Sequence, residues 1–317
     1  MFVKLQLTTT NAYVIINKII FSIKNHITDY IKTFEWKGII MKIKIVGDSA
    51  SNLYGLSGVT YECAPLKIIT DAKEYVDTVT LDLQGMVDDL RAYKGKSGTA
   101  CPSVGDYLAA FEGYDEIYVV TIISTLSGSY NAAMQAKAQY EEENPGKRVF
   151  VVDSYTAGGE QKLHLEKLRD LVLEGKDFDT ICKEITEYKD HGTSLVFSLE
   201  SMINLANNGR VPMIVAKALN FIGLRMIGIV SEEGQIHPTD KARGEKKALE
   251  TIWAKMKSEG FKGGRLRIDH CFNEKTANEI KALALAEFPE ADVKVEPTGA
   301  LCSFYAEKGG LMIGFEI

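Results

Sequence analysis

The chain has 317 residues, 45% hydrophobic and 25% charged, which is the composition of a globular protein of about two domains. A net charge of -6 argues against a nucleic-acid-binding protein, because phosphate contacts need clustered Lys and Arg. No apolar run reaches the roughly 18 residues that span a bilayer, so no integral membrane segment is expected. The five cysteines are scattered without a C-x-x-C pair, which predicts reduced cytoplasmic thiols and no metal site.

Residues 1–40 differ in character from the rest of the chain. Polar residues such as Asn17, Lys18 and Lys24 interrupt every apolar stretch, so the segment lacks the apolar core of a signal peptide. Met41 then opens a first strand, and the codons of Lys37-Gly38 can spell a ribosome-binding site before it. We therefore expect residues 1–40 to be a non-native or disordered extension. A poorly packed amphipathic helix is the alternative.

From Met41, short apolar runs alternate with segments of helical spacing. Strands are predicted at 42–46, 64–70, 116–123 and 148–152, and helices at 79–93, 104–111 and 130–143. Strands separated by helices indicate βαβ units and a largely parallel sheet, which binds ligands at the carboxyl ends of its strands.

The second half begins after the turn at Asp153-Ser154. Helices are predicted at 159–173, 178–189, 199–207, 212–220, 245–257 and 274–287, with a hairpin at 224–230 and 235–238, a strand at 265–270 and two closing strands. We expect an α/β protein with an N-terminal domain at 41–160, whose largely parallel sheet has flanking helices. A mixed-sheet α/β domain at 161–317 follows, and the boundary near residue 160 is not sharp.

The segment from Ser124 to Tyr130 places four Ser and Thr hydroxyls between a hydrophobic strand and a helix. A helix N-terminus has free N–H groups and a partial positive charge, so this segment predicts an anion site. The alternative is that Ser127 or Ser129 only caps the helix. Catalytic signatures are missing, because no G-x-G-x-x-G follows a strand and Thr125 and Ser129 occupy the glycine positions of G-x-S-x-G.

Three further residues are candidates for binding. Thr99 lies in a loop before Ser103, which together with Asp106 fits a capping box and is therefore interpreted as structural. Arg210 lies in a tight turn between two helices, where it is either solvated or able to meet a carboxylate or phosphate. His270 ends a predicted strand, a position that suits a ligand contact or a structural histidine equally.

These stretches, in order, resemble the motifs of the DegV family over about residues 41–317. Asp48-Ser49 matches a D-S turn, Thr99 to Ser103 a T-S-Q-P-S loop and Ser124 to Tyr130 an S-S-x-L-S-G-T/S-Y segment. Asp153-Ser154 matches a second D-S, and the run from Asn208 to Val211 matches a G-G-R-I turn.

The resemblance implies two α/β domains with a long-chain fatty acid, such as palmitate, in a pocket between them. It implies that the carboxylate is held by Thr99 and Ser127, with Ser124 as the alternative serine, and that Arg210 faces the head group or a partner. It further implies a cytoplasmic protein without catalytic activity, metal or cofactor, which transfers lipid or presents it to a separate ATP-dependent fatty acid kinase.

The sequence departs from the family pattern in three respects, one of which is that the kinase-facing role expected of Arg210 is carried by one residue only. Ala100 and Cys101 replace a hydroxyl and an amide of the T-S-Q-P-S loop, and Tyr305 replaces the histidine of a C-terminal G-P-V-I-G-x-H-x-G-P-G run. An alternative function is therefore kept open, namely an enzyme that acts on a small carboxylate or phosphate at the helix start from Ser124 to Tyr130. A third is a sensor of bound lipid that acts through a partner.

Overall fold

The structure, a computed structural model, describes residues 41–220, 224–231 and 234–317. The expectation for residues 1–40 therefore lies outside the described residues. Residues 43–317 form one compact unit. In the described part of the chain, no helix combines the length and the apolar character needed to cross a membrane.

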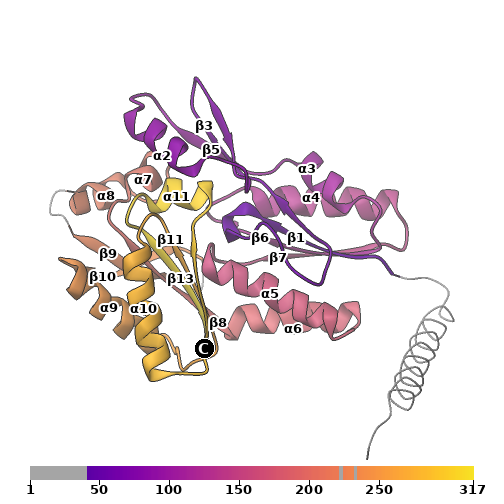
Figure 1. Cartoon of the computed structure of the whole chain (residues 1–317). Coiled ribbons are helices and arrows are strands. Elements are labelled where there is room, and N and C mark those ends of the chain that lie inside the picture. The colour runs from indigo at the N-terminus through magenta and orange to yellow at the C-terminus, as the bar shows by residue number, and fades with distance from the viewer. Residues whose placement is uncertain (1–40, 221–223, 232–233) are drawn as a thin grey trace, which may run out of the picture. The chain divides into compact units, whose positions relative to one another are not determined.

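A parallel sheet of four strands occupies the first half of this unit, in the order β2-β1-β6-β7. Its strands are β1 (Ile43–Asp48), β2 (Tyr61–Ala64), β6 (Glu116–Thr121) and β7 (Arg148–Asp153). One face packs on α3 (Val104–Phe111) and α4 (Ser129–Glu143), and the other on α5 (Gly159–Leu173) and α6 (Phe178–His191), as Figure 1 shows. Because both faces are covered, the central strand β6 is buried along its whole length.

The strand expected at 64–70 is found only in part, as β3 (Lys67–Ile69). The chain forms β2 and then β3, which belong to different sheets and are separated by Pro65. Proline has no N–H to continue a ladder, so the strand ends there. β3 pairs antiparallel with β4 (Glu74–Val76) and β5 (Gly98–Ala100), forming a small sheet that packs on α2 (Leu83–Ala92). Thr99 therefore lies on β5, paired with Ile68, and not in the loop that was expected.

The second half contains a mixed sheet of six strands, in the order β10-β9-β8-β13-β11-β12. Its strands are β8 (Thr193–Leu199), β9 (Arg225–Val230), β10 (Ile236–Ala242), β11 (Arg265–His270), β12 (Asp292–Pro297) and β13 (Leu311–Glu316). Only β11 and β12 pair in parallel. The expected α/β fold with one parallel and one mixed sheet is confirmed.

Two elements of this half were not predicted. β8 is central in the sheet, and its apolar run from Leu195 to Phe197 is a local strand signal that was missed. α11 (Ala300–Ala306) is a short helix before the last strand. The remaining helices are η1 (Ser49–Ser51), α7 (Ile203–Asn207), α8 (Met213–Asn220), α9 (Glu245–Ser258) and α10 (Glu274–Glu287).

Helix α5 packs against both sheets. Its first residue, Gly159, lies so close to β11 that an added Cβ would be 2.3 Å from the Arg267 carbonyl oxygen. One turn later, the buried Lys162 Nζ lies 2.8 Å from Asp269 Oδ1 and 2.7 Å from Glu296 Oε2. The second sheet is thereby fixed to the helix that covers the first sheet.

Candidate functional site

A cavity of about 330 Å³ lies where the carboxyl ends of β6 and β7 meet the six-stranded sheet and α11. Most of its lining is apolar, which suits the hydrocarbon part of a ligand. The lining comprises Leu66, Thr99, Ala100, Cys101, Ile122, Ile123, Leu126, Ser127, Gly128, Thr156, Ala157, Leu195, Phe197, Leu199, Leu205, Arg210, Val230, Ile236, Leu301, Cys302, Tyr305, Ala306 and Met312.

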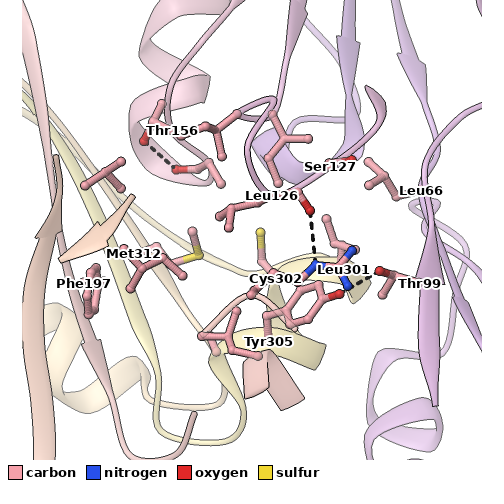
Figure 2. A pocket seen from close by; sticks show the side chains of 18 of the residues that line it. Leu66, Thr99, Leu126, Ser127, Thr156, Phe197, Leu301, Cys302, Tyr305 and Met312 are labelled. Atoms are coloured by element: carbon pink, nitrogen blue, oxygen red, sulfur yellow. Dashed lines mark hydrogen bonds between the residues drawn. The ribbon is translucent and has the colours of Figure 1, made fainter. Parts of the chain in front are cut away.

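Thr99, Tyr305, Ser127 and Arg210 lie at one end of the cavity, whereas Thr156, a further hydroxyl of the lining, lies away from Thr99 (Figure 2). Thr99 Oγ1 and the Tyr305 hydroxyl are hydrogen-bonded at 2.7 Å. The Arg210 guanidinium lies over the Tyr305 ring, with its Cζ 5.7 Å from the centroid, and its Nε donates to the Leu126 carbonyl at 3.2 Å. Figure 2 shows Thr99, Tyr305 and Ser127 on one side of the cavity and Phe197 and Met312 on the other. The cavity is therefore an apolar chamber with a polar end.

The turn between β6 and α4 orients Ser127. The backbone N–H groups of Leu126 and Ser127 both donate to the Ile123 carbonyl, which closes the turn. Ser127 Oγ accepts a hydrogen bond from the Ser129 N–H at 3.3 Å. Because that bond uses a lone pair of the oxygen, the hydroxyl hydrogen of Ser127 is free to donate to a ligand in the cavity.

Asp48, at the end of β1, accepts hydrogen bonds from both ends of this turn. Its Oδ2 accepts hydrogen bonds from Ser129 Oγ at 2.6 Å and from the Ile122 N–H at 2.8 Å, and its Oδ1 accepts one from Gln161 Nε2 at 2.8 Å. The side chain is completely buried, and this burial raises its pKa to about 6. The D-S turn of the sequence therefore fixes the start of α4 from the neighbouring strand β1.

Asp77 positions α11 in a similar way. Its carboxylate accepts hydrogen bonds from the N–H groups of Ala300 at 2.7 Å and Leu301 at 3.0 Å, and from the Tyr54 hydroxyl at 2.6 Å. These N–H groups are the free donors at a helix start, where a negative charge is favourable. Because α11 is anchored at this end, Tyr305 is directed at Thr99.

Comparisons with known proteins identify the family. Residues 42–316 match the model of the DegV family, which is described as uncharacterised. A DegV domain-containing protein of Streptococcus pneumoniae is 39% identical over 281 residues, which are 87% of this chain and all of that protein. The chain belongs to the DegV family.

Two solved structures of the DegV type carry a fatty acid. A DegV family protein from Eubacterium eligens, loaded with heptadecanoic acid, is 41% identical and matches with a TM-score of 0.83 over 86% of this chain and 99% of its own. The fatty acid kinase B3 protein of Streptococcus pneumoniae, loaded with linoleic acid, is 39% identical with a TM-score of 0.85 over 87% of this chain and all of its own.

The DegV motifs come together only in part. Thr99, Ser127 and Arg210 all line the cavity, although they come from three distant segments. Ser124 and His270 are not among the described residues of the lining. The Ser124 N–H donates to Asp153 Oδ1 at 3.1 Å, and His270 Nδ1 accepts from the Asn273 N–H at 3.4 Å. Ser103 and Asp106 form the capping box that the sequence predicts.

Tyr305 was noticed in the sequence as a departure from the DegV pattern and was not predicted to be a site residue. It lies within a helix that was not predicted, so no expected position tied it to Thr99. The available signal was the replacement of a family histidine by tyrosine, because both side chains carry a ring with a hydrogen-bonding group. Burial raises the pKa of the Tyr305 hydroxyl, so it stays protonated.

Proposed function

We propose that this chain binds a long-chain fatty acid in the cavity, with the carboxylate at Thr99 and Ser127 and the hydrocarbon along the apolar lining. The single observation that carries the proposal is the grouping of Thr99, Ser127 and Tyr305 at one end of a cavity whose lining is mostly apolar. The relatives loaded with heptadecanoic and linoleic acid support it, because both match this chain over nearly their whole length.

The chemistry of the polar end suits a carboxylate. Ser127 has a free hydroxyl hydrogen, and the phenol of Tyr305 can donate to Thr99 Oγ1 and so leave the Thr99 hydrogen for the ligand. Arg210 adds the only positive charge among the described residues of the lining. Each methylene buried in the chamber contributes roughly 0.8 kcal/mol, so the acyl chain supplies most of the affinity. The hydroxyls determine which end of the fatty acid lies at the polar end of the cavity.

We further propose that the protein presents the acyl group to a separate ATP-dependent kinase and performs no bond-making step itself. The described lining contains no His, Lys, Asp or Glu to act as a general base. Its thiols, Cys101 and Cys302, have pKa values raised by burial and are weak nucleophiles at neutral pH. Arg210, half-buried at its turn, is the residue we assign to contact with the head group or the partner.

The decisive experiment is denaturing extraction of the purified protein, followed by mass spectrometry of the lipids. We expect a long-chain fatty acid in the extract and reversible binding of added fatty acid to the emptied protein. A protein that yields none, binds none and instead binds a small carboxylate or phosphate would overturn the proposal in favour of an enzyme.

Matched variants locate the carboxylate. Thr99→Val and Ser127→Ala should each weaken fatty-acid binding by about tenfold to a hundredfold, because a hydrogen bond to a charged group contributes about 1.5–3 kcal/mol. Ser124→Ala is the control, since Ser124 lies in the same turn but outside the described lining. If Ser124→Ala weakens binding and Ser127→Ala does not, the carboxylate has been assigned to the wrong serine.

A further inference from the structure

One transverse row of residues crosses all six strands of the mixed sheet at the level of the cavity. The row runs from β12 to β10 through paired residues, in the order Glu296, Asp269, Met312, Phe197, Gly228 and Pro238. Met312 and Phe197 line the cavity, on the side away from Thr99 in Figure 2. The row therefore forms the surface that the far end of a bound chain would meet.

The glycine in this row makes room for the Phe197 ring. A Cβ added to Gly228 would lie 2.5 Å from Phe197 Cζ, so the tip of the ring lies against the β9 backbone. The same Cβ would lie 2.4 Å from the His237 carbonyl oxygen, so a side chain at Gly228 is excluded by the backbone as well. The tip of the Phe197 ring therefore occupies space that a side chain at Gly228 would need.

The other half of the row is charged. Asp269, the neighbour of Met312, is completely buried and binds Lys162 Nζ at 2.8 Å and Asn52 Nδ2 at 2.7 Å. Met312 also lies against the start of α5, because a Cβ added to Gly158 would be 2.9 Å from Met312 Cε. The wall at Met312 thus adjoins a buried ion pair, whereas Phe197 adjoins Gly228 of β9, which carries no charged side chain.

We propose that Phe197 and Met312 form the end wall that sets the length of acyl chain this protein accepts, with Phe197 as the side chain that limits it. The inference rests on the fatty-acid binding proposed above. A chain that grows past Phe197 meets the apolar surface of β9. A chain that grows past Met312 meets the buried ion pair of Asp269 and Lys162. Added methylenes gain little binding free energy there, because they cannot replace the polar partners of these charges.

The test is a competition assay in which myristic, palmitic, stearic and arachidic acids displace a fluorescent fatty acid from each variant. For Phe197→Ala, the ratio of arachidic to palmitic affinity should rise by about tenfold or more relative to wild type, since each buried methylene contributes about fourfold. Phe197→Leu should give a smaller rise in the same direction, and it keeps the test valid if the alanine variant does not fold.

Two further variants separate the wall from general loosening of the sheet. Ser198, the residue after Phe197 on β8, is completely buried, and its hydroxyl has no hydrogen-bond partner among the described residues. Ser198→Ala should therefore leave the chain-length profile unchanged. Met312→Ala should raise the ratio much less than Phe197→Ala. An equal profile for Phe197→Ala and Ser198→Ala, with palmitate still bound, would overturn the end wall alone. A wild type that binds no fatty acid would overturn the proposed function with it.

Discussion

Ser129 Oγ donates a hydrogen bond of 2.6 Å to Asp48 Oδ2, and this contact joins the first strand to the turn that carries Ser127. Ser129 is completely buried and also pairs with the Tyr107 hydroxyl at 2.7 Å. The donors to Asp48 are a backbone amide, a hydroxyl and a side-chain amide. An ionised Asp48 is thus stabilised by dipoles alone, and its pKa is raised from 3.8 to about 6 by burial.

This pKa predicts a pH-dependent stability. A carboxyl group with a higher pKa in the folded protein binds its proton more tightly there, so its contribution to stability is full below about pH 4 and is lost as the pH rises through about 6. The difference between 3.8 and about 6 corresponds to about 3 kcal/mol. Asp48→Asn removes the titration, so the free energy of unfolding of the wild type relative to this variant should fall by about that amount from pH 4 to pH 7.

Urea unfolding of both proteins at several pH values measures this difference. The variant should fold, because the Gln161 Oε1 atom has no hydrogen-bond partner among the described residues, and a flip of that amide provides an acceptor for the N–H groups of the introduced side chain. A wild-type-minus-variant difference that is flat between pH 4 and pH 7 would show that Asp48 has an ordinary pKa.

The sequence predicted β1, β6 and β7 of the parallel sheet, because their signals are local, but it did not place β2. Strand β6 and helices α3 and α5 could be located from apolar spacing and caps within a few residues. Helix α11 could not, because its start is anchored by Asp77, which lies far along the chain, whereas the apolar run of β8 was a local signal that was missed. The same distinction holds for the site. Ser127 has a local signal in its helix start, whereas the pairing of Thr99 with Tyr305, 206 residues apart, is a tertiary contact.

Cys101 provides a chemical probe of the occupied cavity. It lines the cavity and is partly exposed, and burial raises the pKa of its thiol, so alkylation at neutral pH should be slow. A bound fatty acid should slow alkylation of Cys101 several-fold further, because it fills the space next to the thiol. Cys182 is the internal control, as it lies on α6 and is not among the described lining residues.

Peptide mass spectrometry of an alkylation time course, with and without palmitate, measures the alkylation rate of both cysteines in one sample. Equal protection of Cys101 and Cys182 would indicate a general tightening of the protein. Protection of neither would place the ligand away from Cys101.

Lys162 should be essential for stability. Its ammonium group is buried against Asp269, which is itself completely buried. Lys162→Met leaves the Asp269 charge without its cation and should lower the free energy of unfolding by about 3–5 kcal/mol. The double variant Lys162→Met with Asp269→Asn should recover much of this loss, because the buried Asp269 charge is removed and Glu296, the other partner of Lys162, is exposed to solvent. Urea titrations of the three proteins test this, and equal losses in the single and double variants would contradict it.

Tyr305 predicts the pH dependence of ligand binding. The described lining contains no histidine, and the phenol of Tyr305 stays protonated because burial raises its pKa. Fatty-acid affinity should therefore be nearly constant between pH 6 and pH 8. Tyr305→His places an imidazole next to Thr99. The ordinary pKa of an imidazole, about 6.5, lies within that range. Its protonated form adds a positive charge near the carboxylate, so affinity in this variant should rise as the pH falls.

Tyr305→Phe is the matched control, because it removes the hydroxyl and adds no titrating group. It should weaken binding by a similar factor at every pH, through loss of the hydrogen bond that orients Thr99. Displacement titrations of the three proteins across this range distinguish the cases. A slope in Tyr305→Phe as steep as that in Tyr305→His would assign the titration to another group, and a flat profile in Tyr305→His would place the carboxylate away from residue 305.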